Sequence, residues 1–132
     1  MKKLGIEPEE YSIADGSGLS RQNLITPQAL NKVLTAIAQT TNESTYRNSL
    51  ARAGINGTLR NRFRNSELEA NLWGKTGSLS GVITLAGYLK LANQNSVVFS
   101  VLVNNFDDKN KIARAAMDEV LLFLTQWQKC LD

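Results

Sequence analysis

Four consecutive residues in the second half of the chain have the functional groups of a peptide-binding site. Lys75, Thr76 and Gly77 form the tripeptide KTG, and Ser78 follows directly. An ammonium and a hydroxyl can both bind a carboxylate, and a glycine lets a substrate backbone approach without a Cβ clash. The backbone N–H of Ser78 could then serve as an oxyanion donor. A given tripeptide arises by chance about once in 8,000 windows, so its surroundings decide whether it is meaningful.

Composition excludes several other kinds of catalytic site. The 132 residues include no histidine and a single cysteine, Cys130. These counts rule out a Cys/His zinc site, an intrachain disulfide and a Ser-His-Asp triad, and we expect neither a metal nor another cofactor. Cys130 has no clear cationic or basic neighbour, so we interpret it as a spare thiol rather than a nucleophile.

The charge pattern gives no sign of nucleic-acid binding. The formal net charge is +3, which is small for a protein that binds a polyanion. Five arginines gather between positions 47 and 64, but aromatic residues do not alternate with them as a base-stacking surface would require. We therefore interpret the arginine cluster as a solvated face.

The first half of the chain predicts two helices separated by loops. A short extended piece at Tyr11–Ala14 runs into the Gly-rich loop Asp15–Asn23, whose Asp15, Ser17 and Ser20 suit turn and cap hydrogen bonds. Thr26 and Pro27 then have the pattern of an N-cap and first helical residue. A second helix is predicted over Glu43–Ala53, with Asn42 as its cap and Gly54 as its C′ residue, followed by a loop with short helical pieces to Asn71.

The second half of the chain predicts an antiparallel sheet and a covering helix. Strands are expected at Leu72–Thr76, Ile83–Leu91 and Ser96–Val103, with KTG ending the first of them. Asp107 or Asp108 can cap a final helix that lies across the sheet. The predicted fold is a single α+β domain over residues 1–132, an antiparallel sheet with flanking helices. The buried stripe of the final helix is expected to comprise Ile112, Ala116, Val120, Phe123, Leu124 and Trp127.

Three blocks of the chain together resemble a known enzyme family. They read IADGSGLSRQNLITPQAL, AGINGTLRNRF and KTGSLSGVITLAGYL, in that order. The resemblance is to the D-alanyl-D-alanine carboxypeptidases and endopeptidases of the class C low-molecular-mass penicillin-binding proteins, and it runs from about Ile13 to the final helix. It implies a β-lactamase/transpeptidase-like domain, with the active site between the sheet and an all-helical region.

The resemblance also implies roles for the four residues. Lys75, Thr76 and Gly77 would lie on the strand that lines the cleft, with Lys75 and Thr76 binding the terminal D-Ala carboxylate. Ser78 would give one of two oxyanion-hole N–H groups. The partners implied for the full-length enzyme are a peptidoglycan stem peptide and β-lactams.

The nucleophile of that family has no counterpart in these 132 residues. The family uses a serine in an SxxK motif and a second motif, usually SDN, both before KTG, and neither SxxK nor SxN occurs here. The nearest substitutes are SLAR at Ser49–Arg52 and YRN at Tyr46–Asn48. Arginine does not deprotonate in proteins, so SLAR cannot form the dyad, and we interpret YRN as an exposed helix face. The first two motifs would lie before Met1.

Two functions therefore stay open at this point. The first is an incomplete catalytic domain of a serine-type D-Ala-D-Ala carboxypeptidase or endopeptidase, itself inactive. The second is a non-catalytic remnant or peptide-binding module. The resemblance implies action outside the cytoplasmic membrane, although we find no export signal and no apolar run long enough for a transmembrane segment. An apolar strand edge at Ser96–Val103 is expected to be left open, which predicts a homodimer through that strand.

Overall fold

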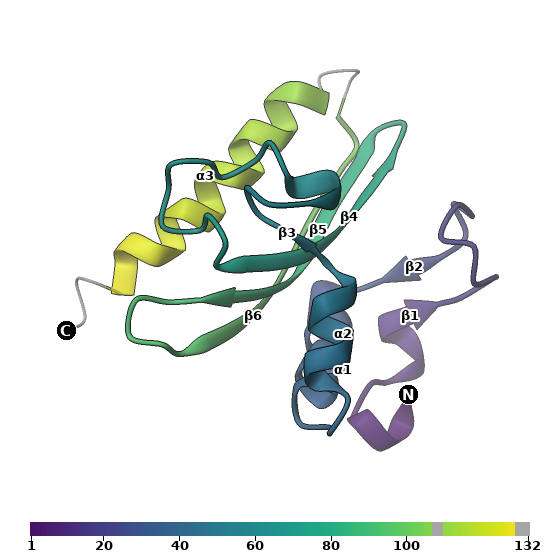
Figure 1. Cartoon of the computed structure of the whole chain (residues 1–132). Helices are drawn as coiled ribbons and strands as arrows, with labels where there is room; N and C mark the ends of the chain where they lie inside the picture. Colours follow the sequence, from purple (N-terminus) through teal and green to yellow (C-terminus); the bar gives the residue numbers. More distant parts are fainter. Residues whose placement is uncertain (107–109, 129–132) are drawn as a thin grey trace.

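A four-stranded antiparallel sheet forms the centre of the protein, with helices on both of its faces (Figure 1). The computed structural model describes residues 1–106 and 110–128. The strands are β3 (Ala51–Arg52), β4 (Leu72–Leu79), β5 (Val82–Lys90) and β6 (Ser96–Asn104), and they lie in that order. Each pairs antiparallel with its neighbour. The predicted α+β class and the three main strands are thus confirmed.

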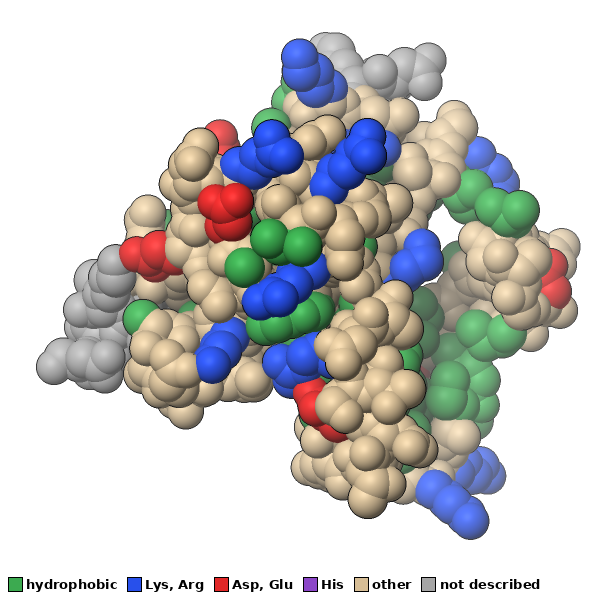
Figure 2. All heavy atoms as spheres, in the orientation of Figure 1, with side chains coloured by type: hydrophobic (Ala, Val, Ile, Leu, Met, Phe, Trp, Pro, Cys, Tyr) green, Lys and Arg blue, Asp and Glu red, His purple; other side chains and the backbone are tan. Residues whose placement is uncertain are grey.

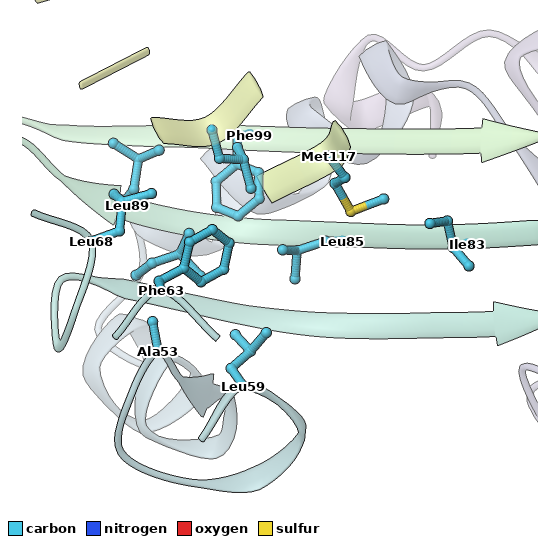
Figure 3. Close-up of a cluster of buried hydrophobic side chains, with 11 residues drawn as sticks. Ala53, Leu59, Phe63, Leu68, Ile83, Leu85, Leu89, Phe99 and Met117 are labelled. Carbon is cyan, nitrogen blue, oxygen red and sulfur yellow. The ribbon is translucent and has the colours of Figure 1, made fainter. Parts of the chain in front are cut away.

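Helix α3 (Asn110–Gln128) crosses one face of the sheet and buries the larger core beneath it (Figure 1). Leu85, Leu89 and Phe99 project from the strands toward Met117 and Leu121 of the helix. Figure 3 shows that Leu59 and Phe63 reach the same cluster from the irregular segment before β4. This core holds together the strand that carries KTG, the segment before it and the final helix.

Helices α1 (Pro27–Ala38) and α2 (Glu43–Ser49) pack on the opposite face of the sheet. Tyr88 is buried there against Leu34 and Leu50, and its hydroxyl donates to the Leu34 carbonyl oxygen at 2.8 Å. Burial raises the pKa of the Tyr88 phenol. The Thr26 side chain accepts a hydrogen bond from the backbone N–H of Ala29 at 3.1 Å, which confirms Thr26 as the N-cap of α1.

The N-terminal segment forms short elements beside α1. They are two 3₁₀ turns, η1 (Lys2–Leu4) and η2 (Pro8–Glu10), and a two-stranded ladder of β1 (Tyr11–Ser12) and β2 (Leu24–Ile25). The loop between the two strands is organised by Asp15, whose carboxylate accepts from the hydroxyl and N–H of Ser17 and from the side chain of Asn23. These hydrogen bonds lower the pKa of Asp15 and confirm the structural role predicted for its side chain.

Two predicted element boundaries were wrong. The second helix ends at Ser49 rather than Ala53, because Leu50 leaves the helical conformation and Ala51–Arg52 pair with β4. Their ladder hydrogen bonds with β4 replace the helical ones. Strand β4 does not end at KTG either, since pairing with β5 continues to Leu79 and the turn is made by Ser80 and Gly81. KTG therefore lies in the middle of a strand.

The predicted buried stripe of the final helix was also wrong. Ile112, Val120 and Phe123 are 65%, 52% and 62% exposed, whereas Met117, Leu121 and Thr125 are buried. Apolar residues occur on nearly every side of α3, so the periodicity allowed more than one stripe. The proposed caps Asp107 and Asp108 and the residue Cys130 lie outside the described residues, as does the side chain of Trp127. No helix in the described part of the chain is long and apolar enough to cross a membrane.

Candidate substrate-binding site

The KTG segment lies on an open edge of the sheet. Strand β3 pairs only with Trp73 and Gly74, so within residues 1–106 and 110–128 no strand covers the outer edge of β4 from Lys75 to Leu79. In Figure 1 the β4–β5 hairpin extends beyond the short edge strand β3. The outer edge of β4 is thus open to an extended peptide.

The hydrogen-bond register decides which backbone groups face that edge. Lys90 donates its N–H to the Asn71 carbonyl at 2.8 Å, while Ala53 on the other side donates to Leu72 at 2.9 Å. Antiparallel ladders alternate residue by residue, so even-numbered residues of β4 direct their N–H and C=O groups away from β5. The N–H of Ser78 and the carbonyl of Thr76 therefore face the open edge. The Lys75 ammonium donates to that Thr76 carbonyl at 2.6 Å.

Side chains also alternate along β4, and this separates the residues of KTG. Lys75 shares the face of Trp73, which packs with the α1 and α2 cluster. Thr76 and Ser78 lie on the opposite face, toward α3, where they line a cavity of about 350 Å³. Lys75 is not part of that lining. The other lining side chains of this cavity include Thr58, Arg62, Arg114 and Met117.

Contacts from two distant segments fix this cavity. The hydroxyls of Thr76 and Thr58 are hydrogen-bonded at 2.9 Å, and Thr58 belongs to the 3₁₀ turn η3 (Gly57–Leu59). Nη2 of Arg114, from the first turns of α3, lies 3.5 Å from Oγ of Ser78. Arg62 is paired with Asp118 through two hydrogen bonds, one of them 3.2 Å from Nε to Oδ2. Neither Thr58 nor Arg114 was predicted as a site residue. Thr58 lies within the AGINGTLRNRF block, but no local pattern shows that it contacts KTG.

Three of the clustered arginines do not form the solvated face that was predicted. The guanidinium carbons of Arg47 and Arg52 lie 5.2 Å and 5.0 Å from the ring centroid of Trp73, on the Lys75 face of β4. Arg47 is also paired with Glu43 at 2.5 Å, so the YRN segment is not an exposed helix face.

Of the other clustered arginines, Arg62 is partly buried as well. Only Arg60 and Arg64 are exposed as expected. On the side of the molecule shown in Figure 2, basic side chains are spread over the middle and upper part.

The Gly-rich loop Asp15–Asn23 reaches the end of the same hairpin. Nη2 of Arg21 donates to the Ser80 carbonyl oxygen at 3.2 Å. This contact ties the loop to the turn between β4 and β5, 59 positions along the chain. No cluster of three or more potential metal-ligating side chains (His, Cys, Asp or Glu) forms among the residues that the structure describes.

A protein-family model covers almost all of these features. The model of the D-Ala-D-Ala carboxypeptidase 3 (S13) family matches residues 1–125, a range that includes the Gly-rich loop, the Thr58 turn, KTG and Arg114. The chain belongs to the S13 family. Its sequence is 35% identical over 132 aligned residues to penicillin-sensitive carboxypeptidase A of Dictyostelium discoideum, an alignment that covers 94% of this chain and 25% of that protein.

A second relative has known structures. D-alanyl-D-alanine carboxypeptidase DacB of Haemophilus influenzae is 35% identical over 122 residues, covering 89% of this chain and 26% of the relative. The crystal structure of that organism's penicillin binding protein 4 matches with a TM-score of 0.74 over 83% of this chain and 24% of the solved chain. The Haemophilus protein has also been solved in complex with a β-lactam. This chain thus spans about a quarter of the length of these two relatives.

Proposed function

We propose that these residues form the substrate-holding wall of a serine-type D-alanyl-D-alanine carboxypeptidase or endopeptidase that acts on peptidoglycan. The observation that carries the proposal is the open edge of β4, where the N–H of Ser78 points outward beside the hydroxyls of Thr76 and Ser78. Membership of the S13 family supports it. Family membership supports action at the cell wall, outside the cytoplasmic membrane.

An extended stem peptide would add to the edge of β4 as a further strand. The Ser78 N–H would be one of two oxyanion donors, and Thr76 and Ser78 would reach its terminal carboxylate. Gly77 keeps the strand free of a side chain, and a Cβ there would lie 2.4 Å from Oγ1 of Thr84. The Lys75 side chain leaves β4 on the other face, but its ammonium reaches the Thr76 carbonyl and would bring a positive charge to the open edge.

The catalytic serine is not among these 132 residues, since no SxxK motif occurs in them. That absence favours a second candidate function, a peptide-binding module without catalysis of its own. In either case the chain is expected to form no covalent adduct when incubated with a labelled penicillin. An acyl adduct detected by intact-mass spectrometry would show that a nucleophile is present after all.

Peptide recognition can be tested separately, with the amide resonances of Thr76 and Ser78 as the readout in NMR titrations. A peptide ending in D-Ala-D-Ala is expected to bind more tightly than its L-Ala-L-Ala counterpart. Thr76→Val should weaken binding about tenfold, because it removes a hydrogen bond to a charged group while preserving side-chain shape. Thr35→Val, on the exposed side of α1, is the matched control. Equal binding of the two peptides would contradict the proposed function.

Strand β6 gives a further prediction about self-association. It is the last strand of the sheet in the described part of the chain, and its ladder with β5 leaves one edge unpaired. We propose that two copies pair through Ser96–Val103, as open edges favour. Light scattering at protein concentrations of roughly tens of micromolar, a range suited to weak association, should report a dimer. Leu102→Lys should restore the monomer because a charged side chain on an edge strand opposes pairing. A wild-type monomer at this concentration would refute the dimer.

A further inference from the structure

We propose that Arg114 is the residue that binds the C-terminal carboxylate of the peptide and so selects substrates with a free carboxylate. This inference rests on the proposed function and adds a residue of the final helix to the proposed peptide-binding site. Arg114 lies 36 positions after Ser78, outside the three sequence blocks that indicated the site. It would act in the cavity beneath the open edge of β4, together with Thr76 and Ser78.

The geometry brings three polar side chains to one place. Nη2 of Arg114 lies 3.5 Å from Oγ of Ser78, a distance at which one carboxylate could contact both groups. The Thr76 hydroxyl lines the same cavity and is hydrogen-bonded to Thr58. In the structure the Thr76 hydroxyl donates to Thr58. Because a hydroxyl both donates and accepts, the two can exchange roles when a ligand binds, so that Thr58 donates and the Thr76 hydrogen is directed at the ligand. The cavity volume of about 350 Å³ is within the range of small-ligand sites.

The charges in the cavity favour an anion at Arg114. Arg62 also lines the cavity, but Asp118 neutralises it through two hydrogen bonds. Among the described lining residues there is no Asp or Glu, and the structure gives Arg114 no carboxylate partner in residues 1–106 and 110–128. Its guanidinium is therefore the uncompensated positive charge of this cavity.

Lys75 is less well placed for that task. Its side chain leaves β4 on the opposite face and donates to the Thr76 carbonyl. A guanidinium can also hold a carboxylate through two parallel hydrogen bonds, which an ammonium cannot do. Thr76 and Ser78 would then position the carboxylate, Arg114 would neutralise it, and the Lys75 ammonium would remain at the Thr76 carbonyl on the open edge.

The test compares peptides that differ only at the C-terminal group. Binding of a peptide ending in D-Ala-D-Ala, of its C-terminal amide and of its L-Ala-L-Ala counterpart is measured by NMR titration of the 132-residue chain. Arg114→Gln is expected to weaken the D-Ala-D-Ala carboxylate peptide at least tenfold and to leave the amide unchanged. Arg114→Lys should recover part of the loss, because it keeps the charge without the bidentate geometry. Lys111→Gln removes an exposed charge one turn earlier on α3 and is the matched control.

The outcomes separate this inference from the proposed function. If Arg114→Gln binds the carboxylate peptide as the wild type does, or weakens carboxylate and amide equally, the role of Arg114 is refuted while the preference for D-Ala-D-Ala can stand. If carboxylates bind through Arg114 but the L-Ala-L-Ala peptide binds equally well, Arg114 is supported and the proposed substrate class fails. A wild-type chain that binds none of the peptides refutes both.

Discussion

Replacing Gly87 with alanine is expected to destabilise the protein by about 3–5 kcal/mol, at the upper end for a single substitution. Gly87 lies directly opposite Gly74 in the ladder between β5 and β4. A Cβ at position 87 would lie 2.0 Å from the Trp73 carbonyl oxygen and 2.8 Å from the Gly74 Cα. Both contacts are with backbone, so no side-chain rotation relieves them and the two strands would have to separate.

Urea unfolding monitored by circular dichroism measures this effect. Gly16→Ala is the matched control, because a Cβ at position 16 meets nothing within 4 Å. NMR spectra of the folded variant can separately follow the Lys75 and Ser78 amides, which should shift in Gly87→Ala since the displaced segment of β4 leads directly into KTG. A loss of stability no larger than that of Gly16→Ala would mean that β4 and β5 do not approach as closely as the structure shows.

Sequence patterns predicted the parts of the fold that depend on local chemistry. Thr26 and Pro27 began α1 where expected, because capping and the fixed φ of proline act within one turn. The runs rich in β-branched and aromatic residues became β4, β5 and β6. Two predictions that required long-range information failed. Residues Ala51–Arg52 became a strand because β4 was available as a partner, and α3 turned a different face to the sheet.

The candidate site was likewise predicted from the sequence only in part. The sequence located Lys75, Thr76, Gly77 and Ser78 because they are adjacent, and the S13 family match includes them. Their division between two faces follows from the extent and register of β4, which was expected to end at Thr76. Thr58 and Arg114 reach the cavity only through the packing of η3 and α3 against the sheet. Thr58 belongs to the AGINGTLRNRF block, but no local pattern predicted that either residue contacts KTG.

That packing can be tested at Leu59, the residue after Thr58. Leu59 is fully buried in the core under α3. Leu59→Ala should destabilise the protein by about 2–5 kcal/mol, because it removes buried apolar atoms and leaves a cavity that the packed neighbouring side chains cannot fully fill. Ile55→Ala is the matched control from the same loop, since Ile55 is 55% exposed and should cost far less. Both values come from urea unfolding.

Leu59→Ala should also weaken binding of a D-Ala-D-Ala peptide under conditions where the variant remains folded. Leu59 anchors the turn that holds Thr58 against the Thr76 hydroxyl, so a loosened turn would leave that hydroxyl free to rotate. Thr58→Val should then reproduce the loss of binding with little loss of stability, because it removes the hydrogen bond and keeps the volume. If Leu59→Ala lost stability but bound the peptide normally, the orientation of Thr76 would not depend on η3, and Arg114 and Ser78 alone would have to hold the carboxylate.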